Sequence, residues 1–147
     1  MKTLTPFTES EVKQLVSDWY LKLDVHAPSE ELLSMLANET LEMQFPEGAV
    51  NGQNEFQTWY DRVIHTFFDE VHTMQALDIK TTSEQADIQL VVRWEASRWE
   101  APAPKSQRLA FDAAQRWVVK RSHLTHKPVI ETYIVDSLTP LEGFPSL

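Results

Sequence analysis

The sequence predicts an α+β fold in which helices pack on a strongly curved antiparallel sheet that forms a cone with an internal apolar pocket. Two observations predict it: helical periodicity is confined to roughly the first 70 residues, and the remainder alternates with the period of β-strands. The alternating segments run to roughly 12 to 15 residues, and strands of that length must coil or bend to stay packed. Because 147 residues with 42% hydrophobic content suit one core, we expect a single domain over 1–147.

The first half of the chain carries three predicted helices. Thr8 followed by Glu11 has the form of a capping box, and apolar residues then recur at helical spacing, namely Val12, Leu15, Val16, Trp19 and Leu23. Ser29 is expected to cap a short second helix that ends near Asn38 and buries Leu32, Leu33 and Leu36. From about Gln53 a second long amphipathic helix is expected, with the apolar positions Phe56, Trp59, Tyr60, Val63, Ile64 and Phe67.

The strands are predicted from alternation of apolar and polar residues. Residues 40–45 alternate and are followed by a Pro-Glu-Gly turn. Four longer strands are then expected: 70–81, 86–99, 107–119 and a last one from about Val129 to Leu138. The links between them are short and polar, so neighbouring strands should pair antiparallel as a meander.

The composition excludes several classes of function. With 13 Lys plus Arg against 22 Asp plus Glu, the formal charge of -9 disfavours nucleic acid and anionic membranes as partners. The absence of cysteine excludes disulfides, thiolate metal sites and cysteine nucleophiles. Neither a secretory signal nor a run approaching the ~18 apolar residues of a membrane span is present. We therefore expect a soluble, unprocessed protein of the reducing cytoplasm.

The order of elements resembles the nuclear transport factor 2-like superfamily, in its SnoaL-like branch, which implies the cystatin-like α+β roll. The closing segments RWVVKRS and KPVIETYIVDSLTP are similar to the paired last strands of that family. Two more segments, LVSDWYLKLD and FFDEVHTMQAL, resemble lindane dehydrochlorinase and, more distantly, scytalone dehydratase. In those enzymes the two segments hold a paired Asp and His, which fall here on Asp24 and His72. Trp94 falls nearest the place of a second histidine in scytalone dehydratase, so a histidine-pair mechanism is not expected.

The resemblance implies general acid–base chemistry at Asp24 and His72. Asp24 would orient the imidazole, fix its tautomer and leave the second ring nitrogen free as a base. In the isomerase branch of the family, a tyrosine of the first helix donates a hydrogen bond to a developing oxyanion. The resemblance implies the same role for Tyr20, four positions before Asp24. The expected function is a cofactor-independent lyase or isomerase that dehydrates, eliminates, isomerises or cyclises a small, apolar, cyclic molecule. Neither a metal nor a cofactor is expected.

Six further side chains are expected to line the pocket, namely Trp19, Trp59, Met74, Trp94, Phe111 and Asp136. Each has a simpler alternative, because aromatic residues at strand spacing equally suit a core and Asp136 equally suits the outer face. Asp24 could be a solvated helix end, and His72 a half-exposed member of a cross-strand pair. His65, His123 and His126 are expected at the surface, without a metal.

Two other functions stay open beside the enzyme. One is a non-catalytic module that binds a small ligand or dimerises, and the other is an accessory subunit of a larger oxygenase. A homodimer through the sheet is expected, because an outer face carrying Val91 and Trp99 would otherwise leave apolar area in water.

Overall fold

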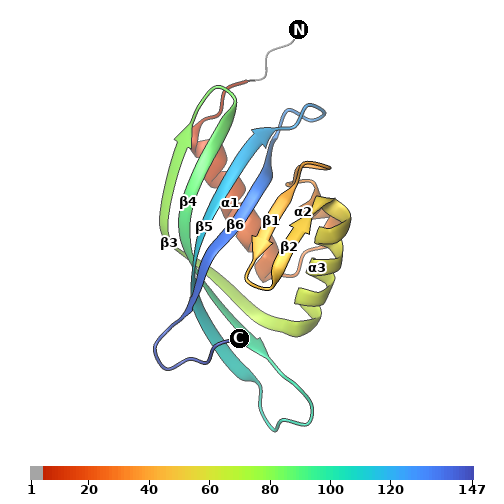
Figure 1. Cartoon of the computed structure of the whole chain (residues 1–147), viewed down its shortest axis with the longest axis vertical. Coiled ribbons are helices and arrows are strands. Elements are labelled where there is room, and N and C mark those ends of the chain that lie inside the picture. The colour runs from red at the N-terminus through yellow and green to blue at the C-terminus, as the bar shows by residue number, and fades with distance from the viewer. Residues whose placement is uncertain (1–4) are drawn as a thin grey trace.

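The computed structural model describes residues 5–147, and its helices cover one face of a bent sheet (Figure 1). The elements in chain order are α1 (Glu9–Asp24), α2 (Ser29–Leu33), β1 (Glu42–Phe45), β2 (Gly48–Asn51), α3 (Gly52–Thr66), β3 (Phe67–Thr81), β4 (Gln85–Arg98), β5 (Gln107–Arg121) and β6 (Pro128–Pro140). The predicted α+β class is thus confirmed. Within these residues no helix combines the length and apolar character needed to cross a bilayer.

The six strands form one sheet in the order β2-β1-β6-β5-β4-β3. β3 to β6 pair as the expected antiparallel meander, but β1 runs parallel to β6, with Met43 opposite Tyr133. The expectation of a purely antiparallel sheet was therefore wrong. β2 was also missed, because its four residues are too few to show an alternating pattern beside the turn that precedes them.

The ends of the helices differ in detail from the prediction. Thr8 does cap α1, since its hydroxyl accepts the Glu11 N–H at 3.2 Å. The Glu11 carboxylate does not complete the box; it pairs with the buried guanidinium of Arg121, which holds the pKa of Glu11 below its ordinary value. Ser29 is the first residue of α2 rather than its cap, and α2 ends at Leu33, well before Asn38.

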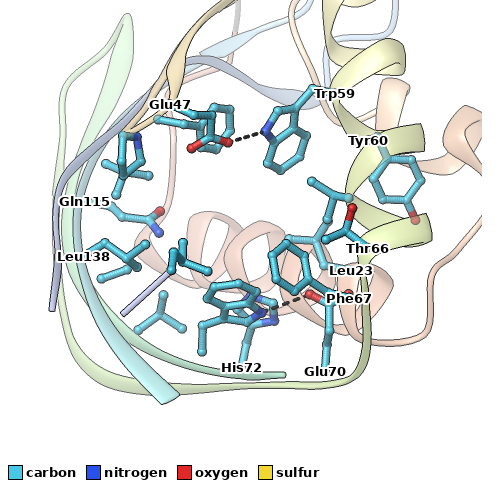
Figure 2. Close-up of a pocket in the computed structure, with 18 of the residues that line it drawn as sticks. Leu23, Glu47, Trp59, Tyr60, Thr66, Phe67, Glu70, His72, Gln115 and Leu138 are labelled. Carbon is cyan, nitrogen blue, oxygen red and sulfur yellow. Dashed lines mark hydrogen bonds between the residues drawn. The ribbon is translucent and has the colours of Figure 1, made fainter. Parts of the chain in front are cut away.

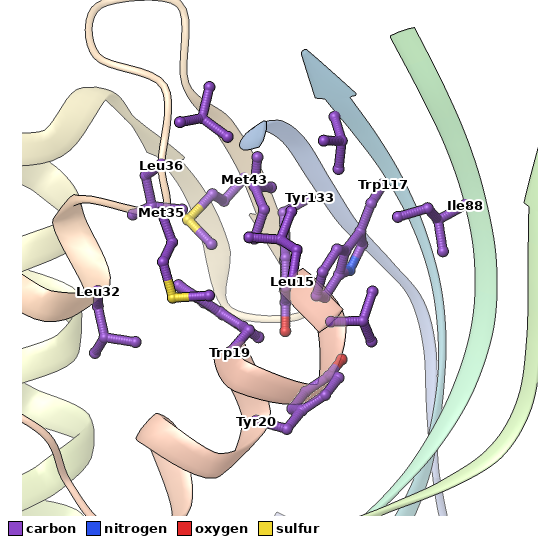
Figure 3. Packing of buried hydrophobic residues seen from close by; sticks show 14 of the residues in the cluster. Leu15, Trp19, Tyr20, Leu32, Met35, Leu36, Met43, Ile88, Trp117 and Tyr133 are labelled. Atoms are coloured by element: carbon purple, nitrogen blue, oxygen red, sulfur yellow. The ribbon is translucent and has the colours of Figure 1, made fainter. Parts of the chain in front are cut away.

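The core lies between α1, the short strands and the middle of the sheet (Figure 3). Its centre is aromatic: the Trp19 ring lies 5.9 Å from Phe56, 6.4 Å from Trp117 and 5.9 Å from Tyr133, measured between ring centroids. Inward residues of β5 alternate as predicted and are all buried, namely Leu109, Phe111, Ala113, Gln115, Trp117 and Val119. This packing fixes α1 on the sheet and so positions the helix end that enters the site.

Bulges in the sheet decide which side chains face inward. In β3 a register shift falls between Phe68 and Val71, and Asp69 there adopts a left-handed φ of 52°. Since side chains alternate with a period of two, one extra residue moves all later positions to the opposite face. His72 therefore faces the same side as Phe67, although the two are five positions apart.

Truncation of the aromatic centre tests this arrangement. Trp19→Ala is expected to lower the free energy of unfolding by about 3–5 kcal/mol, because the ring is 1% exposed and its removal leaves a cavity. Leu124→Ala, at a side chain that is 89% exposed, should change it by less than about 0.5 kcal/mol. Urea unfolding followed by circular dichroism measures both, and equal effects of the two variants would contradict the packing.

Candidate active site

A cavity of about 520 Å³ opens between α3 and the concave face of the sheet (Figure 2). Its walls are mainly apolar and come from α1, β1 and the turn after it, α3 and the long strands. They include Leu23, Phe45, Trp59, Val63, Phe67, Val92, Trp94, Ala113, Val135 and Leu138. Polar side chains reach into it at a few places, among them Glu70, His72 and Gln115. A mostly apolar hollow with a few convergent polar groups is typical of a small-molecule site.

His72 lines this cavity and is contacted by Asp24, which lines a neighbouring surface groove rather than the cavity itself. Asp24 is the last residue of α1, and its Oδ1 lies 2.5 Å from Nδ1 of His72. Its other oxygen, Oδ2, accepts the backbone N–H of His72 at 3.2 Å. The side chains are 19% and 9% exposed, so this contact is largely shielded from water.

The contact sets the tautomer of the imidazole. In the neutral ring the nitrogen that faces a carboxylate carries the proton, so Nδ1 donates to Asp24 and Nε2 keeps its lone pair. Because His72 lines the cavity, a ligand bound there can contact this side chain. The arrangement is chemically able to remove a proton from a bound molecule.

Tyr20 lies behind His72 rather than in the cavity. Its ring stacks on the imidazole, with centroids 4.8 Å apart, and its hydroxyl donates to Oε1 of Gln115 at 3.0 Å. Burial, together with the nearby Tyr133 phenol, raises the pKa of Tyr20 well above its ordinary value. The expectation that this hydroxyl faces a substrate was therefore wrong, because the Gln115 side chain lies on the cavity side and engages it.

A second imidazole–carboxylate pair stands beside the first. Glu70, two residues before His72, accepts the indole N–H of Trp94 through Oε1 at 3.0 Å and pairs through Oε2 with Nε2 of His26. Glu70 is buried and lines both the cavity and a surface groove that His26 also lines. Sequence reasoning missed this pair, because the bulge that turns Glu70 inward leaves no signal in the alternation.

The predicted pocket residues divide into two groups. Trp59 and Trp94 line the cavity; Trp59 stacks on Phe45 with centroids 4.3 Å apart and donates to Glu47 at 3.2 Å. Trp19, Met74 and Phe111 do not line it. Trp19 is in the aromatic core, Met74 packs on the edge of that core, and Phe111 stacks behind Trp94 at 5.8 Å.

Asp136 lies on the outer face of the sheet, contrary to the prediction. It is the unpaired extra residue of a bulge in β6, where Ser137 pairs with Ala114 and Val135 with Gln115. Its carboxylate pairs with the Arg116 guanidinium, which holds the pKa of Asp136 below its ordinary value. A bulge again reverses the face that simple alternation assigns.

His65, His123 and His126 lie at the surface, as predicted. The side chain of His65 is 73% exposed, and His123 and His126 are also exposed. Within residues 5–147 no three His, Cys, Asp or Glu side chains gather in a way that could hold a metal ion.

Comparison with known proteins shows the fold. No protein-family model and no curated protein matches the chain by sequence. One similar solved structure is a protein of unknown function with a cystatin-like fold from Nostoc punctiforme PCC 73102 (TM-score 0.70, 16% identity, covering 99% of this chain and 100% of that one). A second is the hexachlorocyclohexane dehydrochlorinase LinA-type3 from Novosphingobium barchaimii LL02 (TM-score 0.72, 15% identity, covering 94% of this chain and 92% of that one). A third is a nuclear transport factor 2-like superfamily protein from Salmonella enterica serovar Typhimurium LT2 (TM-score 0.72, 13% identity, covering 91% of this chain and 92% of that one). The chain therefore has the cystatin-like, nuclear transport factor 2-like fold that the sequence predicted.

The tautomer of His72 can be measured without a substrate. In the wild-type protein, ¹⁵N chemical shifts should show neutral His72 protonated at Nδ1, because the carboxylate of Asp24 accepts there. Asp24→Ala should increase the population with the proton on Nε2. A ring that stays protonated at Nδ1 in this variant would mean that Asp24 does not set the tautomer.

Tyr60, also at the cavity wall, is expected to lower the free energy of unfolding at alkaline pH. Burial, with the Glu70 and Glu31 charges, raises its pKa to about 12, and its hydroxyl donates to the Ala27 carbonyl at 2.6 Å. Unfolded tyrosine ionises near pH 10, so between pH 10 and 12 the unfolded state loses this proton first and the folded state loses stability. Tyr60→Phe should cost about 0.5–1.5 kcal/mol at pH 7 through the lost hydrogen bond.

The difference in unfolding free energy between Tyr60→Phe and wild type should then shrink as pH rises from 10 toward 12, because only the wild type carries this ionisation. Urea unfolding across that range measures the difference. A constant difference would contradict the raised pKa of Tyr60.

Proposed function

We propose that the protein is a cofactor-independent lyase of small, largely apolar, cyclic molecules, with His72 as the general base. The observation that carries the proposal is the contact of Asp24 with Nδ1 of His72 at the wall of an apolar cavity. Such a contact prepares Nε2 to accept a proton, and the apolar walls exclude water that would compete for it.

The reaction begins with removal of an acidic C–H proton from the bound molecule by Nε2. The imidazolium that forms is stabilised by the Asp24 carboxylate, which keeps its negative charge throughout. The electron pair of the broken C–H bond forms a double bond as a leaving group departs with its own pair, and the proton passes from His72 to the leaving group or to water. A dehydrochlorinase of the same fold supports elimination over isomerisation, as a likeness of fold only.

The base assignment is tested with variants on a panel of chlorinated cyclohexanes and β-hydroxy cyclic ketones, following release of chloride or water. His72→Ala is expected to lower kcat/KM about 10²- to 10⁴-fold, since general base catalysis contributes that much. Asp24→Asn should lower it in the same direction, because an amide can hold the wrong tautomer. His65→Ala, an exposed histidine on α3, is the matched control and should leave turnover unchanged.

The alternative is a protein that binds a small molecule without converting it, which the apolar character of the cavity alone favours. In that case compounds of the same panel would bind to the cavity, but the rate of product formation would not differ between wild type, His72→Ala and Asp24→Asn. Equal rates for these variants and wild type would exclude the lyase.

We also propose that the protein is cytoplasmic. We further propose that it forms a homodimer through the outer face of the sheet. Val91 is half-buried on that face, and Trp99, which follows the last residue of β4, is 54% exposed. The same face also carries the Arg93–Asp112 ion pair, so the interface would be mixed rather than wholly apolar. Sedimentation at micromolar concentration should give twice the chain mass of 17.0 kDa, and a monodisperse monomer would exclude the dimer.

A further inference from the structure

Glu70 lies in the wall between the cavity and the solvent. Among residues 5–147 it is the one side chain that lines both the cavity and the surface groove beside it, a groove that also holds His26, Asp69 and Arg108. The Glu70 side chain is 5% exposed and that of His26, its partner, is 26% exposed. The two ionisable groups therefore form a link, the His26–Glu70 link, that leads from the buried cavity to the surface.

The two oxygens of Glu70 face opposite ends of this link. Oε1 accepts the Trp94 indole N–H at 3.0 Å, and Oε2 faces Nε2 of His26. Trp94 is also the cross-strand neighbour of His72, so the carboxylate and the base lie at the same end of the cavity (Figure 2). Because a carboxylate oxygen has two lone pairs, Oε1 can accept a proton while the indole still donates to it.

The backbone is strained on both sides of the His26–Glu70 link. His26, directly after the C-cap of α1, has a φ of 51°, and Asp69, directly before Glu70, has a φ of 52°. This left-handed conformation is unfavourable for residues with a Cβ, and such strain gathers at functional sites. A buried ion pair adds little net stability, so packing alone does not account for the link.

A base at His72 requires a route by which its proton returns to solvent. Asp24 lines the groove, but a proton that left through Nδ1 would leave the ring protonated at Nε2, the tautomer that cannot act as the base. The route therefore starts at Nε2. Two carboxylates line the cavity among the described residues, and one of them, Glu47, lies at the far end and accepts from Trp59 (Figure 2). The other is Glu70.

We propose that Glu70 and His26 carry the proton between His72 and the solvent. This rests on the proposed function of His72 as the base. The His72 imidazolium gives its Nε2 proton, directly or through one water, to the Glu70 carboxylate, which becomes a carboxylic acid. The acid passes a proton to Nε2 of His26 and is a carboxylate again, and the other ring nitrogen of His26 releases its proton to water. His72 is then a neutral base whose Nδ1 still donates to Asp24, and exchange with water restores the first tautomer of His26.

The His26–Glu70 link is tested in the substrate-free protein by ¹⁵N relaxation dispersion of the His72 ring, at a pH where its neutral and charged forms are both populated. This measures the rate at which His72 exchanges its proton. Glu70→Gln keeps hydrogen-bonding groups for Trp94 and His26 but cannot carry a proton, and His26→Ala removes the outer member. Each should slow the exchange about tenfold or more.

Imidazole added to the solution should restore the exchange rate in His26→Ala, where it can reach Glu70 from the groove, but not in Glu70→Gln. A purely structural clamp between α1 and β3 would not produce this difference. His65→Ala, at an exposed histidine of α3, is the matched control and should leave the rate unchanged. An unchanged rate in His26→Ala, or equal recovery of both variants with imidazole, would overturn the proposal. If Glu70→Gln does not fold, the rate in His26→Ala and its recovery decide alone.

Turnover of the chlorinated cyclohexanes separates the His26–Glu70 link from the base assignment. His26→Ala should lower kcat about tenfold and leave kcat/KM unchanged, because the proton leaves His72 after the C–H bond has broken. Slow His72 exchange in both variants, with no compound of the panel converted by wild type, would keep the link and exclude the lyase. Turnover that depends on His72, with exchange and kcat both insensitive to His26→Ala, would keep the lyase and exclude the link.

Discussion

Asp24 binds His72 twice, through the ring and through the backbone N–H, and the rest of the site depends on this double contact. It joins the last residue of α1 to β3, and so holds together two of the elements that form the cavity. The same contact decides which ring nitrogen is free. One carboxylate therefore sets both the position of the His72 ring and its tautomer. That carboxylate is held in place because Trp19, in the preceding turns of α1, packs into the core against Trp117.

The polar groups of the cavity share one design. Glu70 accepts a hydrogen bond from the Trp94 indole with one oxygen and pairs with His26 through the other. The Gln115 oxygen accepts hydrogen bonds from Tyr20 and Trp117. His72 likewise donates from Nδ1 to Asp24. Each group is satisfied on its protein side, which limits the cost of burying it, and is held in one orientation by that partner. His72 retains its second ring nitrogen, with which a ligand can interact.

The fold by itself would not select a function, because the solved structures that share it include a dehydrochlorinase and a protein of unknown function at 15% and 16% identity. The proposal of a lyase rests instead on the geometry at His72, whose ring stacks on Tyr20 and whose Nδ1 contacts Asp24.

The sequence by itself determined the helices and the long strands, because periodicity of 3.6 or two residues is a local property. The resemblance of two segments to known enzymes, and not periodicity, indicated Asp24 and His72. It also showed a polar residue, Gln115, among inward apolar positions of β5, without indicating its partners. Only the tertiary structure decided the inward face of Glu70 and the outward face of Asp136. Each lies at a bulge, and a bulge depends on how two distant strands pair rather than on the residues of one strand.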